Sequence, residues 1–146
     1  MSELPPVLLV EDDESHALLV DRVMRKARLA NPLVAFQNGE RALSHLMAAV
    51  TDEGDGAIPA LVLLDLHVPG RSGLEILEWI RSRGELERLP VLIFSGSGES
   101  RDINRAFELG VDSYLVKPVA FDALLDAVND LSLPWALLRR DQGPDA

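Results

Sequence analysis

The sequence predicts an α/β protein in which a parallel sheet carries helices on both faces. Short apolar runs, typical of strands, alternate along the chain with stretches whose apolar residues recur at helical spacing. The run Leu61–Leu64 is apolar at four consecutive positions, which is typical of a central strand covered on both faces. Turn-forming pairs such as Asn38-Gly39 and Pro69-Gly70 separate the elements. Alternation of this kind indicates right-handed βαβ units.

Five segments are expected to be strands. They are Val7–Val10, Leu33–Phe36, Leu61–Leu64, residues 91–94 and Ser113–Val116. Residues 51–59, which are polar and glycine-rich, and residues 84–90 are expected to be extended surface loops.

Five segments are expected to be amphipathic helices. Their apolar stripes are Leu19, Val20, Val23, Met24 and Ala27; Ala42, Leu43, Leu46, Met47 and Val50; Leu74, Ile76, Leu77 and Ile80; Ile103, Ala106, Phe107 and Leu109; and Phe121, Leu124, Leu125 and Val128. We expect Asn31-Pro32 to stop the first helix and Gly110 to follow the end of the fourth.

The composition limits the possible functions. The chain has 146 residues, which is the size of one ordinary domain, and we find no internal repeat. Acidic residues outnumber basic ones 24 to 14, and a net charge of −10 disfavours binding to nucleic acid. No cysteine is present, so disulfides and thiolate metal sites are excluded. Without a signal peptide or a membrane-spanning run, we expect a soluble cytoplasmic protein.

Polar side chains follow four of the five expected strands. Glu11 and Asp12 follow the first strand, Asp65 the third, Ser95 the fourth and Lys117 the fifth. The carboxyl ends of parallel strands meet at one edge of the sheet, where ligands of open α/β sheets bind. We therefore expect these groups to gather there.

This combination of groups favours phosphoryl chemistry. Two close carboxylates repel each other by roughly 4 kcal/mol at an effective dielectric constant near 20, unless a cation joins them or their pKa values rise. Clustered oxygen ligands suit Mg²⁺, and a hydroxyl and a lysine nearby suit a phosphoryl group. Acids replace the glycine-rich loop that a nucleotide site needs, so a carboxylate that carries the phosphoryl group covalently is the remaining option.

Four separated motifs carry a family resemblance. In order, they are VEDDE, LLDLHVPGRSG, IFSGS and SYLVKP. Over about residues 7–131 the chain resembles the receiver domain of bacterial two-component response regulators. The resemblance implies a flavodoxin-like, doubly wound (βα)5 sandwich with strand order 2-1-3-4-5.

The resemblance also implies a phosphoacceptor and a metal site. Asp65 is expected to accept the phosphoryl group from a sensor histidine kinase. Asp12 is expected to bind Mg²⁺ directly and Glu11 through water, with Asp65 and the backbone carbonyl of His67 completing the protein ligands. The side chain of His67 is expected to overhang the phosphate and to alter the access of water.

Three further residues acquire roles from the resemblance. Ser95 and Lys117 are expected to bind the incoming phosphoryl oxygens, and Tyr114 to swing inward on activation, although a strand aromatic can also simply pack on the sheet. The activation-sensitive region is expected to be the fourth strand, fourth helix and fifth strand. Lys117-Pro118 is expected to be cis.

Four other polar residues near the site are expected to lie outside the chemistry. Asp13 and Glu14 are expected to favour the positive N-terminus of the first helix rather than the metal. His16 and His45 are expected to be exposed helix residues without a role.

Residues 132–146 exceed a minimal receiver domain, which we place at residues 1–131. The extension contains Trp135, Leu137 and Leu138 and is too short for a DNA-binding domain. An apolar cluster with a tryptophan is expected to be buried against another protein surface. We favour a homodimer arm, with docking on its own domain as the alternative. The extension and the long loops resemble single-domain regulators that partner bacterial phytochrome kinases.

The prediction is thus a stand-alone receiver that is not an enzyme, except in its own phosphorylation and dephosphorylation. One alternative is a pseudo-receiver that acts as a phosphorylation-independent interaction module. The other is a phosphatase or phosphotransferase of the haloacid dehalogenase type, whose chemistry requires a second Asp two residues after the nucleophilic Asp. His67 occupies that position.

Overall fold

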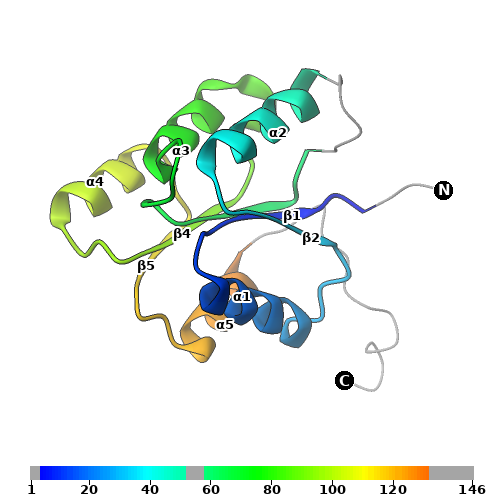
Figure 1. Ribbon diagram of the computed structural model, residues 1–146, viewed down its shortest axis with the longest axis vertical. Coiled ribbons are helices and arrows are strands. Elements are labelled where there is room, and N and C mark those ends of the chain that lie inside the picture. The colour runs from blue at the N-terminus through cyan, green and yellow to red at the C-terminus, as the bar shows by residue number, and fades with distance from the viewer. Residues whose placement is uncertain (1–3, 52–57, 132–146) are drawn as a thin grey trace.

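The protein, seen in a computed structural model, is described for residues 4–51 and 58–131. Strands and helices alternate through the described chain (Figure 1). In order, the elements are β1 (Val7–Val10), α1 (Glu14–Lys26), β2 (Leu33–Phe36), α2 (Gly39–Thr51), β3 (Leu61–Leu64), α3 (Gly73–Ser82), the 3₁₀ helix η1 (Gly84–Leu86), β4 (Val91–Ser95), α4 (Ser100–Glu108), β5 (Ser113–Val116) and α5 (Phe121–Asp130).

All neighbouring strands of the sheet are parallel, and their order is β2-β1-β3-β4-β5. The predicted flavodoxin-like order is therefore confirmed. The chain passes from β1 outward to β2 and then crosses to β3 on the other side of β1. Strand order reverses between β1 and β3, which is where ligands bind in sheets of this kind.

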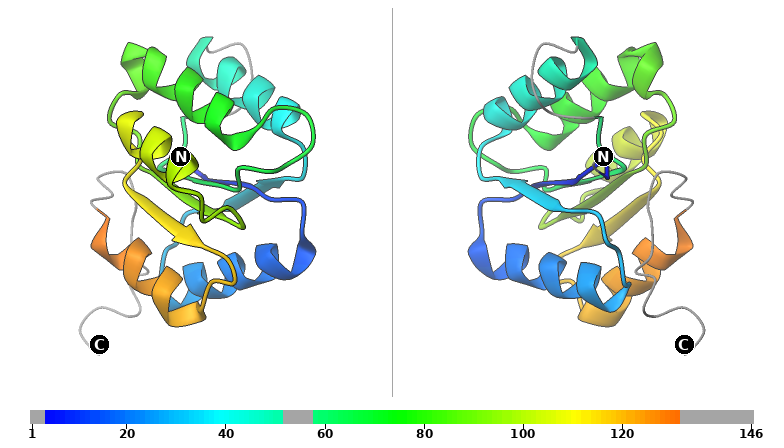
Figure 2. Two further views of the ribbon diagram at one scale, coloured as in Figure 1. Left: turned by 90° about the vertical axis from the view of Figure 1, so that its left-hand side faces the viewer. Right: turned by 90° about the vertical axis from the view of Figure 1, so that its right-hand side faces the viewer.

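Helices cover both faces of the sheet, α2, α3 and α4 on one and α1 and α5 on the other (Figures 1 and 2). Successive strand residues point to opposite faces. Leu8 and Val10 of β1 join the buried cluster beneath α2 and α3, whereas Val7 and Leu9 join the cluster above α1 and α5. This two-sided burial explains why β1 and β3 are apolar at every position.

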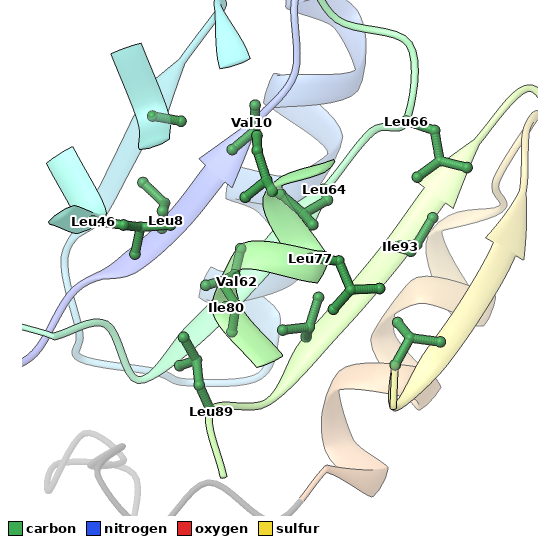
Figure 3. Packing of buried hydrophobic residues seen from close by; sticks show 14 of the residues in the cluster. Leu8, Val10, Leu46, Val62, Leu64, Leu66, Leu77, Ile80, Leu89 and Ile93 are labelled. Carbon is green, nitrogen blue, oxygen red and sulfur yellow. The ribbon is translucent and has the colours of Figure 1, made fainter. Parts of the chain in front are cut away.

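Figure 3 shows the cluster on the α2–α3 face. Leu77 and Ile80 of α3 and Leu46 of α2 are fully buried against residues of β1, β3 and β4. Their helical spacing places them on one side of each helix, as the sequence predicts.

The prediction that Asn31-Pro32 stops the first helix is wrong, because α1 ends earlier, at Lys26. Arg28 has a positive φ of 64°, its N–H donates to the carbonyl of Arg25, and the N–H of Leu29 donates to that of Met24. This is the Schellman arrangement, which glycine usually completes. An arginine in the glycine position hid the helix end from sequence analysis.

The other predicted boundaries need smaller changes. Residues 84–90 are not a simple surface loop, because Gly84–Leu86 form a 3₁₀ turn and Leu86 and Leu89 are buried. Gly110 follows α4 with φ of 83°, as predicted. Of the predicted loop at 51–59, Thr51 is the last residue of α2, and residues 52–57 lie outside the described chain.

Among the described residues, no helix has the length and apolar character needed to cross a bilayer. The extension at 132–146, with Trp135, Leu137 and Leu138, lies outside the described residues.

Candidate functional site

A buried ion-pair cluster lies at the carboxyl edge of the sheet. Glu11 directly follows β1, Asp65 directly follows β3 and Lys117 directly follows β5. The Lys117 ammonium donates hydrogen bonds to Glu11 Oε1 at 2.8 Å and to Asp65 Oδ2 at 2.9 Å. Lys117 therefore reaches from an edge strand to both central strands.

Burial determines the electrostatics of this cluster. Glu11 is 2% exposed and Asp65 is 5% exposed. Burial raises the pKa of Glu11, and the hydrogen bonds from Lys117 and from the Asp13 N–H only partly offset this effect. Burial by itself lowers the pKa of Lys117, but the hydrogen bonds to Glu11 and Asp65 and their negative charge outweigh it and raise the pKa. The amine is consequently held as an ammonium at neutral pH.

The same edge can hold a divalent cation. Carboxylate oxygens of Glu11, Asp12 and Asp65 lie within 4.8 Å of one another, and Asp12 is exposed to solvent. An all-oxygen donor set with an open side suits Mg²⁺, which keeps several of its waters. The cluster combines one ammonium with three acidic groups, so a bound cation would offset its excess negative charge. The residues present therefore fit the metal that the sequence predicts.

The connection between β3 and α3 fixes Asp65. The N–H of His67 donates to Asp65 Oδ1 at 3.1 Å, and the N–H of Gly73 donates to the carbonyl of Leu66 at 3.0 Å. A Cβ atom on Gly73 would lie 2.5 Å from the carbonyl oxygen of Asp65, so a larger residue does not fit without movement. The first turn of α3 thus packs directly on the strand end. The side chain of His67 is exposed.

Ser95 and Tyr114 meet at the loop between β4 and α4. Ser95 is the last residue of β4 and is fully buried, and its Oγ accepts from the N–H of Ser97 at 3.2 Å. The Tyr114 hydroxyl donates to the Ser97 carbonyl at 2.7 Å. Burial raises the pKa of Tyr114. The Lys117–Pro118 peptide bond beside this region is cis.

The predictions for nearby polar residues have different outcomes. Asp13 is the N-cap of α1 and accepts from the Ser15 N–H at 2.8 Å, which confirms its expected place at the helix start. The two histidines are not simply exposed. His16 Nδ1 lies 3.7 Å from Glu11 Oε1, and the half-buried His45 packs against Phe36 with ring centroids 5.2 Å apart. The helical pattern does not predict this burial, because the partner of each histidine, Glu11 or Phe36, lies outside its helix.

Sequence analysis missed Ser97 and Asp102 beside the site, and Arg81 in the last turn of α3, away from it. The Ser97 hydroxyl donates to Asp102 Oδ2 at 2.5 Å, and the Arg81 guanidinium donates to the carbonyl of Gly110 at 2.8 Å. The only available signal for Ser97 was its place in a serine- and glycine-rich turn. Nothing in the helical pattern distinguishes Asp102 or Arg81 from solvated surface residues.

Comparison with known proteins agrees with this geometry. Residues 7–129 match the response regulator receiver domain. The chain belongs to this family. Receiver domains are signalling domains rather than classical enzymes, and the residues that carry the resemblance lie at the strand ends described above.

Two relatives match nearly their full length. The probable methanogenesis regulatory protein FilR2 of Methanothrix harundinacea is 33% identical, over 94% of this chain and 88% of its own. The response regulator Rcp1 of Synechocystis sp. is 31% identical, over 90% of each chain. Both matches extend beyond a shared short motif.

Solved structures include regulators associated with phytochromes. The bacteriophytochrome response regulator RtBRR is 38% identical, with a TM-score of 0.77 over 93% of this chain and 82% of its own. The phosphorylated cyanobacterial phytochrome response regulator RcpA is 26% identical, with a TM-score of 0.75 over 91% and 99%. The Mn²⁺-bound form of Rcp1 is 28% identical, with a TM-score of 0.74 over 92% and 99%.

Proposed function

We propose that this receiver domain is a stand-alone response regulator that accepts a phosphoryl group from a histidine kinase on Asp65. The observation that carries the proposal is the position of the Lys117 ammonium, 2.9 Å from Asp65 Oδ2 and 2.8 Å from Glu11 Oε1, at the switch point of the sheet. The arrangement places one carboxylate nucleophile beside a fixed positive charge.

In the transfer, an Asp65 oxygen attacks the phosphorus of a kinase phosphohistidine. The nitrogen–phosphorus bond breaks, an oxygen–phosphorus bond forms, and the imidazole keeps the electron pair of the broken bond. Lys117 neutralises charge on the phosphoryl oxygens, and Ser95, at the end of the neighbouring strand β4, offers a hydroxyl to them. Burial of Asp65 strengthens both interactions because little water competes with them.

A divalent cation belongs to this proposal, because the acidic groups fit one and a relative is described as Mn²⁺-bound. Glu11, Asp12 and Asp65 would hold Mg²⁺, together with the backbone carbonyl of His67. When bound, the cation supplies positive charge to the phosphoryl oxygens. A relative that is described as phosphorylated supports phosphorylation as the function.

The phosphoryl group on Asp65 is proposed to signal through the β4–α4–β5 region. Added negative charge attracts Ser95 and Lys117, and Ser95 is joined through Ser97 to Tyr114. A local electrostatic change of this kind can shift a region between two arrangements.

The direct test is phosphotransfer to Asp65→Asn. Wild type should acquire acid-labile phosphate from a cognate kinase, and Asp65→Asn should acquire none. Asp13→Asn is the matched control because it removes a neighbouring carboxylate and keeps an N-cap acceptor. If Asp65→Asn still acquires phosphate, another residue is the acceptor. If the wild-type protein does not respond to beryllofluoride with Mg²⁺, the pseudo-receiver alternative is favoured.

The kinase is proposed to be of the bacteriophytochrome type, on the similarity to RtBRR, RcpA and Rcp1. Such a kinase would place this chain in the cytoplasm. A panel of purified kinases tests this, with transfer from phytochrome kinases expected to be faster than from unrelated ones. Equal rates would contradict the assignment.

Residues 132–146 are proposed to form a homodimer arm through Trp135, Leu137 and Leu138. Removal of this extension should lower the mass seen in sedimentation from dimer to monomer. An unchanged mass would remove the proposal, and Asp126→Asn in full-length protein serves as a variant that leaves the extension intact.

A further inference from the structure

Ser97 connects three elements of the β4–α4–β5 region. Its N–H donates to Ser95 Oγ of β4 at 3.2 Å, its carbonyl accepts from the Tyr114 hydroxyl of β5 at 2.7 Å, and its hydroxyl donates to Asp102 Oδ2 of α4 at 2.5 Å. The position of this one residue therefore affects both Ser95 and Tyr114. The first two bonds involve residues that the proposed function already uses, whereas the third does not.

Asp102 lies in the first turn of α4. A hydrogen bond from a hydroxyl to a carboxylate is of the stronger, charge-assisted kind, and a negative charge at this place is favoured by the helix dipole. Among the described residues, Glu99 at the N-cap of α4 makes no capping hydrogen bond with its side chain. The Ser97 hydroxyl therefore joins the loop to the start of α4 through two bonds, a short one to Asp102 Oδ2 and a longer one, of 3.4 Å, that it accepts from the Glu99 N–H.

The opposite end of α4 is held by independent contacts. The N–H of Gly110 donates to the Phe107 carbonyl, and the N–H of Val111 donates to the Ala106 carbonyl. Arg81 of α3 donates to the Gly110 carbonyl from Nη2 at 2.8 Å. Arg81 and the buried Ala106 thus hold the C-terminal part of α4 to the rest of the molecule, whereas the Ser97–Asp102 bond holds its first turn to the β4–α4 loop.

We propose that Asp102 is a positioning residue that holds Ser97, and through it Ser95 and Tyr114, in the arrangement that receives the phosphoryl group. Loss of the Ser97–Asp102 bond releases the β4–α4 loop and the first turn of α4 together. This inference rests on the proposed function for its phosphoryl readout. Its structural readout, the environment of Tyr114, does not depend on that function.

The test measures beryllofluoride affinity in the presence of Mg²⁺ for full-length variants. Asp102→Ala should bind about tenfold more weakly than wild type, since it loses a hydrogen bond to a charged group. Asp102→Asn keeps an acceptor for the Ser97 hydroxyl and should stay within about threefold. Ser97→Ala should bind at least as weakly as Asp102→Ala, because it also removes the acceptor of the Glu99 N–H. The double variant should be no weaker than Ser97→Ala, since the Ser97–Asp102 bond is already lost there.

Tyr114 supplies the second readout, taken from ring NMR signals of the free protein. These signals should shift in Asp102→Ala and Ser97→Ala and stay near wild type in Asp102→Asn. Glu108→Ala is the control, because it removes a carboxylate from the same helix at the fixed end. Wild-type affinity and wild-type Tyr114 signals in Asp102→Ala would overturn the proposal, as would equal effects in Glu108→Ala.

The two proposals fail in distinguishable ways. If wild type does not bind beryllofluoride, the proposed function fails, and the Tyr114 signals of the free variants still decide the role of Asp102. If wild type binds and Asp102→Ala matches it in both beryllofluoride affinity and Tyr114 signals, the positioning role alone fails.

Discussion

Helices α3 and α4 lie side by side on one face of the sheet, joined by an ion pair between Glu78 and Arg105 at 2.9 Å, yet they are held differently. Helix α3 buries Gly73, Ile76, Leu77 and Ile80 and begins with a capping box between Ser72 and Glu75. Against the described part of the chain, α4 buries only Ala106, and its Phe107 is 51% exposed.

The two helices therefore differ in how much apolar surface anchors them to the sheet. Each fully buried Leu or Ile contributes roughly 1.5–3 kcal/mol, so α3 is strongly anchored, and its first turn packs on the Asp65 carbonyl. Helix α4 lacks such anchors and depends on polar contacts at its two ends. The proposed phosphoacceptor Asp65 therefore lies beside the firmly anchored helix, and the proposed signalling region contains the weakly anchored one.

The largest expected difference is in apolar truncations. Ile80→Ala should lower the free energy of unfolding by about 2–5 kcal/mol, because the Ile80 side chain is fully buried on the core-facing side of α3. Phe107→Ala on α4 should change it by no more than about 0.5 kcal/mol. Urea denaturation of both variants measures this, and similar losses would show that α4 is anchored as firmly as α3.

The polar anchor of α4 should have the next largest effect. Arg81 also donates from Nη1 to the Leu89 carbonyl at 2.9 Å, so Arg81→Ala removes charged hydrogen bonds worth roughly 1.5–3 kcal/mol. Amide hydrogen exchange should accelerate in α4 more than in α3. Arg83→Ala is the control, because it removes a partly exposed arginine that pairs with Glu85 and lies over the Trp79 ring, and it should leave exchange in α4 unchanged.

The helix starts should differ by a smaller amount. Ser72→Ala removes the capping box of α3 and should cost about 1 kcal/mol. Ser100→Ala at the exposed start of α4 should cost no more than about 0.5 kcal/mol. Thermal denaturation compares the two, and an equal loss at Ser100 would mean that α4 has a cap of similar strength.

The smallest effect is a pH dependence at the α3 cap. The hydrogen bond from the backbone N–H of Ser72 lowers the pKa of Glu75 from its ordinary value of 4.5. A lowered folded-state pKa contributes stability above pH 4.5 that is lost as the pH falls through the folded value. Wild type should therefore lose more stability than Glu75→Gln as the pH falls below 4.5. Parallel curves would contradict this, and Asp126→Asn on α5 corrects for the loss of a carboxylate in general.

Much of the fold and of the candidate site followed from the sequence, because the signals are local. Apolar runs and helical stripes identify strands and helices through the periods of 2 and 3.6 residues. Parallel topology then brings Glu11, Asp65 and Lys117 to one edge, whatever their side chains do. The end of α1 was missed since Arg28 adopts a backbone conformation that favours glycine.

Only the tertiary structure decided which side chains meet. Lys117 bonds Glu11, 106 residues away, and Arg81 bonds the Gly110 carbonyl, 29 residues away. Ser97 and Asp102 are close in sequence, yet their bond depends on the shape of a loop that no periodic pattern describes. A side-chain hydrogen bond between distant residues forms only where packing has fixed the backbone on both sides. The sequence therefore determines which polar groups lie at the site, and the tertiary structure determines which of them bond to one another.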